Sequence, residues 1–178
     1  MKYLRVILLA AGLLAAPGAE AQDLRADISL QTGRSLDVVV IGERDGRWWV
    51  RPVDSPDGKI GIDPGSVRHI RFHAGEAAEN GLRSFENRKW DEAAAQLRPL
   101  VEKLLPFLSV PTSGAMRVIS PFADALRFAG QRDEAIAIYA RIGKIAPPPL
   151  AGLARLWQAD LLAQNDESAQ ARALLDNL

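Results

Sequence analysis

The chain of 178 residues contains no cysteine. This absence excludes disulfide bonds and thiolate metal sites, and also a lipid-modified export signal, which needs a cysteine at its cleavage point. Long hydrophobic runs are missing as well. The longest, residues 6–16, falls well short of the ~20 apolar residues that span a bilayer. The fold must therefore rest on its apolar cores, and we expect no stable membrane insertion of the mature chain.

Neither sign of charge dominates the sequence, which holds 22 basic and 22 acidic residues. The parts before and after Gly75 are each close to neutral as well. A nucleic-acid-binding domain carries a strong basic excess on one face or in one segment. The balance of charge therefore argues against a nucleic-acid partner.

Histidine is scarce, and the only two are His69 and His73. On a helix, this spacing of four would place both imidazoles on one face, as zinc hydrolases require. The segment alternates like a strand instead, and residues four apart on a strand lie about 13 Å apart. Arg71 between them would also repel a cation. We therefore predict two solvent-facing histidines rather than a metal site.

Other catalytic patterns are missing too. Asp54, Asp57 and Asp63 stand near Gly58 but lack the alternating oxygens and closing glutamate of a calcium loop, so ordinary turn chemistry explains them. The sequence has no Gly-x-Ser-x-Gly elbow and no glycine-rich phosphate loop. We therefore predict a non-enzymatic protein with no catalytic residues, no metal ligands and no cofactor.

The first residues have the pattern of an export signal. Lys2 and Arg5 precede the apolar run, and Ala19-Glu20-Ala21 provides a small-x-small cleavage site. We predict a signal peptide over residues 1–21, cleavage after Ala21 and a periplasmic mature chain. The alternative is an uncleaved membrane anchor, which would need a longer apolar run.

Residues 22–75 have the pattern of short strands separated by turns. Asp45-Gly46, between two β-rich runs, is a strong hairpin signal. Five short strands in so few residues favour a small curled barrel of the SH3-like or Sm-like kind. The expected strands span residues 28–32, 36–41, 47–53, 59–62 and 67–72.

Trp48 and Trp49 are adjacent in this part, so their side chains must point to opposite faces of a strand. One interpretation places one of them in the barrel core and the other against the helices, because large aromatic residues mostly serve burial. The other interpretation is an exposed aromatic platform for a glycan or a peptide.

After Gly75 the apolar period changes from 2 to about 3.6, which predicts helices. A short phrase recurs at Asp91-Glu92-Ala93, Asp133-Glu134-Ala135 and Asp166-Glu167-Ser168, with separations of 42 and 33 residues. A period near 34 residues is typical of stacked helical hairpins. The small residue that closes each phrase is expected where two helices approach closely. The expected helices span residues 76–87, 90–105, 113–129, 133–145, 150–165 and 166–178.

Two prolines, Pro99 and Pro121, fall inside predicted helices, where each removes a backbone hydrogen bond. Either these helices are kinked or their boundaries differ from the prediction.

The middle unit carries a spaced set of residues, namely Gly130, Asp133, Glu134, Ala135, Tyr139 and Pro147. Gly81, Trp90 and Ala93 repeat part of this set in the first unit. The third unit departs from it, with Ser168 in place of alanine and Arg172 where an aromatic is usual. Through these residues, the part from residue 76 to 178 resembles the tetratricopeptide repeat family. The resemblance implies a right-handed superhelical stack of about three hairpins whose inner face binds protein or peptide.

In such a stack the first helix of each hairpin lines the inner face. Aromatic residues among charged ones suit a peptide groove, because aromatics anchor a ligand and charges orient it. The alternative is that the aromatics Phe85, Phe128 and Trp157 fill the seams between helices. The candidate binding residues are Leu82, Phe85, Glu86, Asp124, Arg127, Phe128, Trp157 and Asp160.

The sequence thus predicts an α+β protein in two segregated parts, a five-stranded SH3-like barrel over residues 22–75 and a helical solenoid over residues 76–178. The expected function is a protein- or peptide-binding adaptor or assembly factor of the bacterial envelope. The alternative is a carbohydrate or cell-wall binding module that reads its ligand through the barrel. A homodimer formed through the final hairpin is a further hypothesis.

Overall fold

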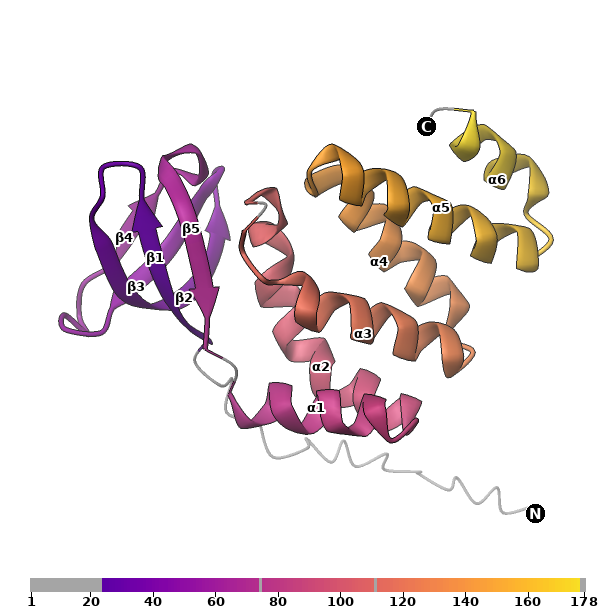
Figure 1. The fold of residues 1–178 in the computed structure, drawn as a ribbon, viewed down its shortest axis with the longest axis horizontal. Helices are drawn as coiled ribbons and strands as arrows, with labels where there is room; N and C mark the ends of the chain where they lie inside the picture. Colours follow the sequence, from indigo (N-terminus) through magenta and orange to yellow (C-terminus); the bar gives the residue numbers. More distant parts are fainter. Residues whose placement is uncertain (1–23, 74, 111, 177–178) are drawn as a thin grey trace, which may run out of the picture.

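The computed structural model describes residues 24–73, 75–110 and 112–176, so the expected signal peptide lies outside the described residues. A five-stranded antiparallel sheet comes first in the chain, and six α-helices follow it (Figure 1). The predicted α+β arrangement, with strands and helices in separate parts of the sequence, is confirmed at this level.

The sheet is built from hairpins, in the order β4-β3-β2-β1-β5. Asp45 and Gly46 both have positive φ between β2 and β3, as a two-residue hairpin turn requires. β4 and β5 lie at opposite edges of this order, and the sheet does not close into a barrel. The strands are β1 (Leu24–Leu30), β2 (Ser35–Arg44), β3 (Arg47–Pro52), β4 (Ile60–Ile62) and β5 (Val67–Phe72).

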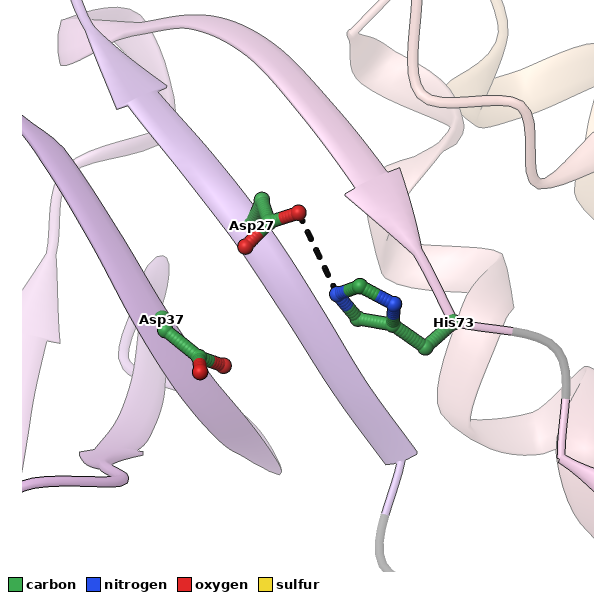
Figure 2. Close-up of side chains that lie close together, drawn as sticks. All are labelled: Asp27, Asp37 and His73. Carbon is green, nitrogen blue, oxygen red and sulfur yellow. Dashed lines mark ion pairs between the residues drawn. The ribbon is translucent and has the colours of Figure 1, made fainter.

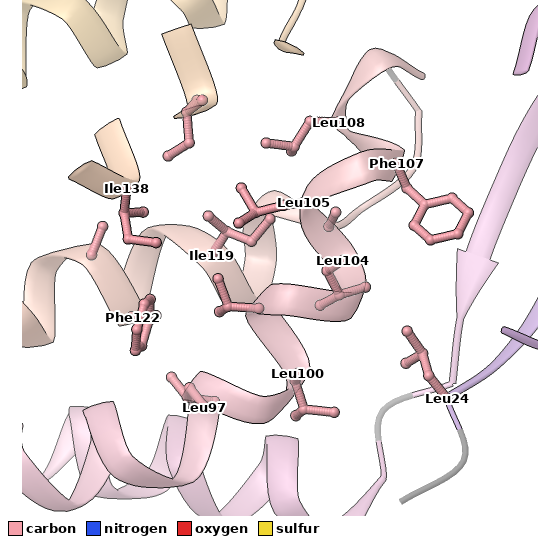
Figure 3. Close-up of a cluster of buried hydrophobic side chains, with 14 of the residues drawn as sticks. Leu24, Leu97, Leu100, Leu104, Leu105, Phe107, Leu108, Ile119, Phe122 and Ile138 are labelled. Carbon is pink, nitrogen blue, oxygen red and sulfur yellow. The ribbon is translucent and has the colours of Figure 1, made fainter. Parts of the chain in front are cut away.

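One face of the sheet is apolar and buried, because alternate residues of a strand point to the same side. Phe107, in the short 3-10 segment η2 (Leu105–Ser109), joins this face to the helices. Its ring centroid lies 4.4 Å from that of Trp48 and 5.2 Å from that of Phe72. Figure 3 shows Phe107 directed away from Leu105 and Ile119 and toward the sheet, so sheet and helices share one continuous core. The buried residues of this face include Ala26, Ile28, Val38, Val40, Trp48, Val50, Ile62, Val67 and Ile70.

The helices form three consecutive antiparallel hairpins, α1 with α2, α3 with α4, and α5 with α6 (Figure 1). α2 and α3 run through Pro99 and Pro121 without a break. The carbonyls that lose a donor belong to Ala95 and Arg117, four positions earlier, and both residues are exposed to water. The helices are α1 (Glu76–Glu86), α2 (Trp90–Leu104), α3 (Met116–Phe128), α4 (Arg132–Ile145), α5 (Pro148–Gln164) and α6 (Ser168–Leu175).

All three hairpins turn in the same way. Arg88, Gly130 and Asp166 each adopt positive φ just after the first helix. The next residue donates its backbone N–H to a carbonyl five positions earlier, as in a Schellman motif. These bonds are 2.9 Å long from Lys89 to Ser84, 2.8 Å from Gln131 to Leu126 and 2.9 Å from Glu167 to Leu162. The left-handed residues provide a common origin for comparing the hairpins.

This origin corrects the register of the third unit. Five positions after the left-handed residue lie Ala93, Ala135 and Ala171, and all three are buried. Ser168, the expected equivalent, is exposed and only begins α6. The true spacings are therefore 42 and 36 residues, and the third Asp-Glu pair belongs to the turn rather than to the helix.

One position of α6 holds a polar residue where the earlier hairpins have apolar ones. Six positions after the left-handed residue, the three hairpins have Ala94, Ile136 and Arg172. Ala94 is buried, and Ile136 packs against the third hairpin, whereas Arg172 is exposed. The exposed arginine leaves no apolar side chain at this position for another helix to pack against. It argues against dimerisation through this part of α6.

Ion pairs connect the second helices of the first two hairpins. Arg141 of α4 donates two hydrogen bonds to the carboxylate of Glu102 in α2, at 2.7 and 2.9 Å. Arg98 of α2 pairs with Glu134 of α4. Both pairs are partly exposed, so each contributes only modestly to stability.

The Glu102–Arg141 pair predicts a dependence of stability on pH. The hydrogen bonds from Arg141 are the main reason why the pKa of Glu102 is lower than usual. A carboxyl with a depressed pKa stabilises the fold above its unfolded pKa, and this contribution is lost as the pH falls. We expect the destabilisation caused by Glu102→Gln, below about 1 kcal/mol at neutral pH, to shrink as the pH falls below about 4, the range in which a glutamate of the unfolded chain becomes protonated. Urea unfolding of both proteins across this range measures it, and a pH-independent difference would contradict the assignment.

Candidate functional site

Equivalent positions in the three hairpins are found by counting back from the left-handed turn residue of each. Leu82, Asp124 and Asp160 lie six positions before it in their hairpins, so they are equivalent. Phe85 and Arg127 are equivalent three positions before it, and Glu86 and Phe128 two positions before it. Positions ten and thirteen before the turn residue lie on the same side of the helix. We call this surface of α1, α3 and α5 the first-helix face, formed by Leu82, Phe85, Glu86, Arg117, Ser120, Asp124, Arg127, Phe128, Leu153, Leu156 and Asp160.

Aromatic rings gather at one end of the first-helix face. The Trp90 ring lies 5.3 Å from Phe85 and 4.8 Å from Phe128, measured between centroids. The Arg127 guanidinium lies over the Phe128 ring, 5.3 Å from its centroid. Phe128 is 51% exposed, whereas Phe85 and Trp90 are partly covered. Phe128 is thus the open end of a supported aromatic cluster, and Trp90 is the member that the sequence analysis did not assign to it.

Trp157 does not join this cluster. Its ring packs on Tyr139, 5.4 Å between centroids, in the seam between α4 and α5. Tyr139 is buried, and its hydroxyl donates a 3.1 Å hydrogen bond to Asp124. Burial, with the neighbouring Asp124 carboxylate, raises the pKa of Tyr139 far above its usual value. Trp157 therefore fills a seam between helices, as the alternative interpretation expected. Asp124 stabilises this seam through its hydrogen bond with Tyr139.

The Tyr139 hydroxyl is expected to contribute to stability. Tyr139→Phe keeps the ring but removes the donor to Asp124, so we expect a loss of about 1–2 kcal/mol in the free energy of unfolding. Urea unfolding measures this loss. The double variant with Asp124→Asn serves as the control, because the two losses should not add if the hydroxyl acts through Asp124. Additive losses would contradict the assignment.

Two leucines of α5 extend the first-helix face. Leu153 is 42% exposed and Leu156 is 49% exposed, at positions thirteen and ten before the turn residue. Neither was predicted, because the predicted binding residues of α1 and α3 all lie two, three or six positions before the turn residue. The signal was present nonetheless, since α5 has apolar residues on all sides, including the side that no helix covers.

Hollows lie at both ends of α3. An open cleft of about 660 Å³ lies at the tip of the second hairpin, where Arg127 and Phe128 meet Gln131, Arg132 and Asn165. A smaller, mostly apolar pocket of about 310 Å³ lies at the other end. Its lining includes Leu108, Val110, Met116, Arg117, Pro149 and Leu150. The first-helix face thus runs between two recesses of different character.

The remaining predicted residues contribute less. Asp160 is exposed, and its carboxylate accepts a 2.9 Å hydrogen bond from Gln164 within the same helix. Glu86 is exposed, and Leu82 is half-buried beside the aromatic cluster on α1. The structure therefore brings Phe85, Arg127 and Phe128 together, and it leaves the acidic residues at the margins.

The two adjacent tryptophans of the sheet have different surroundings. Trp48 is buried against Phe107. Trp49 is half-buried on the opposite face, with Gly42 and Gly61 as its cross-strand neighbours. Its ring lines a pocket of about 350 Å³, and its buried indole N–H has no hydrogen-bond partner among the described residues. Both glycines leave room for the ring to lie across the strands.

His73 belongs to a polar group on the same face as Trp49, and Figure 2 shows it. Its Nε2 lies 3.2 Å from Asp27, while the carboxylate of Asp37 accepts a 2.8 Å hydrogen bond from Arg25. Within the described residues, this is the one grouping of histidine and carboxylates close enough to share an ion. Arg25 already supplies the positive charge beside Asp37, so the arrangement is explained as a cross-strand network. His69 is not part of it.

No helix in the described part of the chain has the length and apolar character needed to cross a membrane. Comparison with protein families, curated proteins and solved structures finds no match to the chain.

Proposed function

We propose that this protein binds a segment of another protein along the first-helix face and acts as an exported adaptor or assembly factor. The helical part is proposed to be a stack of three TPR-like hairpins, and the sheet a variant of an SH3-like barrel that covers one end of it. One observation carries the proposal. Among the large hydrophobic side chains exposed on the described helices, Phe128, Leu153 and Leu156 lie on this face, and only Leu175 lies elsewhere.

Large exposed apolar side chains that share one face with charged residues are typical of protein interaction sites. Phe128 is well suited to anchor a partner, because Trp90 and Arg127 hold its ring in place. The leucines of α5 add apolar surface farther along the first-helix face.

The dimensions fit a short extended segment. α3 has 13 residues, which gives an axis of about 20 Å. An extended peptide of about six residues covers that length at ~3.3 Å per residue. Such a segment would reach from the apolar pocket at Met116 to the open cleft at Phe128.

The test replaces Phe128, Leu153 and Leu156 together with serine. All three residues are about half exposed, at 42–51%, so the fold should remain intact while the apolar anchor is lost. Pull-down from cell envelopes with the wild type and this variant, followed by titration with the purified partner, measures the effect. We expect a loss of affinity of at least about a hundredfold, as anchor residues at an interface imply. The matched control is Leu175→Ser, which removes an equally exposed leucine from α6.

Retention of the same partner by the triple variant would contradict the proposal. In that case the sheet would become the candidate, as a carbohydrate or cell-wall binding module. The pocket beside Trp49 is the observation that favours this second function. It predicts a shift in tryptophan fluorescence when cell-wall saccharides are added, and loss of that shift in Trp49→Leu.

A further inference from the structure

We propose that the bound segment is acidic, and that Arg127 and Arg132 hold its carboxylates beside an apolar side chain resting on Phe128. This inference rests on the proposed function and adds the chemistry of the partner. It concerns the cleft at the tip of the second hairpin, which Arg127, Phe128 and Arg132 line together.

The carboxylates in and beside the cleft already have donors. Asp133 accepts a 3.1 Å hydrogen bond from the Asn165 side chain. Glu134 is paired with Arg98 across the hairpins. Ionised carboxylates only accept hydrogen bonds, and these two are engaged from within the protein. Arg98 therefore balances the charge of Glu134, and the two arginines of the cleft outnumber Asp133, its one carboxylate without an ion pair to a described residue.

Nearby side-chain amides are engaged in the same way. Gln131, at the tip of the second hairpin, donates a 3.0 Å hydrogen bond to Asp91 at the start of α2. This contact repeats the bond from Asn165 to Asp133 one hairpin further along. These two hydrogen bonds connect the tips of the second and third hairpins to the preceding hairpin, so the amides are already used within the fold.

The arginines are the groups with capacity left over. Neither Arg127 nor Arg132 forms an ion pair with any described residue, and Arg132 is exposed. Each guanidinium offers five N–H donors in a planar fork that matches a carboxylate. Arg127 is also held in place by stacking on Phe128. The cleft therefore offers donors and an aromatic surface, and the missing component is a set of acceptors.

This pattern defines the ligand by complementarity. A segment with carboxylates on both sides of one apolar residue would satisfy the two arginines while its apolar side chain covers Phe128. A basic segment would meet two unpaired cations, and like charges placed together are unfavourable. Arg117, at the apolar pocket near the other end of α3, is exposed and has no ion pair with a described residue, so it extends the preference along the face.

The experiment uses three labelled peptides of equal length, with the sequences EEELEEE, KKKLKKK and QQQLQQQ. Fluorescence anisotropy measures their binding to the wild type, to Arg127→Gln/Arg132→Gln and to Phe128→Ser. The matched control is Arg34→Gln/Arg172→Gln, which removes the same net charge from exposed positions outside the cleft. We expect the wild type and the control to prefer the acidic peptide. The cleft variant should bind it about tenfold more weakly, as loss of two partly exposed ion pairs implies.

Each outcome decides one point. Equal binding of all three peptides, or an unchanged affinity in the cleft variant, overturns the acidic preference. If Phe128→Ser still weakens binding in that case, the first-helix face stands as the site and only its chemistry is wrong. If Phe128→Ser has no effect on a peptide that binds, the proposed function fails as well. Absence of binding by the acidic peptide also overturns the inference.

Discussion

Replacing Phe107 with alanine is expected to lower the free energy of unfolding by about 3–5 kcal/mol. The side chain is completely buried and contacts Trp48 and Phe72 of the sheet from its position in η2. Removing the ring would leave a cavity at the junction of the two parts of the molecule. The loss should therefore weaken the coupling between sheet and helices as well as the local packing.

Circular dichroism follows the helices during denaturation, and hydrogen exchange follows the amides of β1 to β3. In the wild type, both should report one transition, because a continuous core makes unfolding cooperative. In Phe107→Ala we expect the two transitions to separate. Phe107→Leu is the control, since it retains most of the apolar volume and should cost clearly less. A loss below about 1 kcal/mol in the alanine variant would contradict the role assigned to this contact.

Gly81→Ala is expected to destabilise the protein by about 1–3 kcal/mol, although alanine is the better helix former. An added Cβ would lie 2.4 Å from Cδ2 and 2.6 Å from Cγ of Leu97, which is too close for either atom. The residue lies seven positions before the left-handed turn residue, where the other hairpins have the buried Ala123 and Ala159. The first hairpin is therefore packed more closely than the other two at this point.

Gly143→Ala provides the comparison within the helices. There the nearest atom to an added Cβ is Cγ of Arg155 at 3.4 Å, at the flexible side chain of an arginine. The gain in helix propensity should then dominate, and the variant should be neutral or slightly more stable than the wild type. Thermal unfolding of both variants tests the pair. If Gly81→Ala and Gly143→Ala change the thermal stability equally, close packing would not be the reason why position 81 needs glycine.

The elements of the fold were predictable wherever a local signal fixed them. Asp45-Gly46 predicts a hairpin turn by its backbone preferences alone, and the structure has that turn. The change of period after Gly75 likewise places the start of the helices, and α1 begins at Glu76. Closure of the sheet was not predictable in this way, because it depends on whether two edge strands meet. The edge strand β4 has only three residues.

The third hairpin shows where a repeated phrase misleads. Asp166-Glu167-Ser168 matches the earlier phrases in residue type, but Asp166 is the left-handed residue of the turn. Because Asp tolerates that conformation, the same residue type can serve in a turn or in the first helical residues. The buried Ala171 identifies the true register, and burial is not visible in the sequence.

The candidate site was predictable in part for the same reason. Phe85, Arg127 and Phe128 lie in correctly aligned hairpins, and the structure brings them together. Leu153 and Leu156 lie thirteen and ten positions before their turn residue, where no binding residue was predicted in any hairpin, and an apolar residue on a helix is more often buried than exposed. Periodicity also could not separate the seam residue Trp157 from an exposed one, since both lie on a helix at apolar spacing.

Site-specific photocrosslinking tests the central claim most directly. A photoreactive amino acid replaces Leu156 on the first-helix face, Glu102 on α2 or Ile41 beside Trp49, all of which are exposed. If the first-helix face binds the partner, a single protein should be captured from position 156, and the other two positions should not capture it. Capture from position 41 or 102 but not from 156 would contradict the account and move the function to another surface.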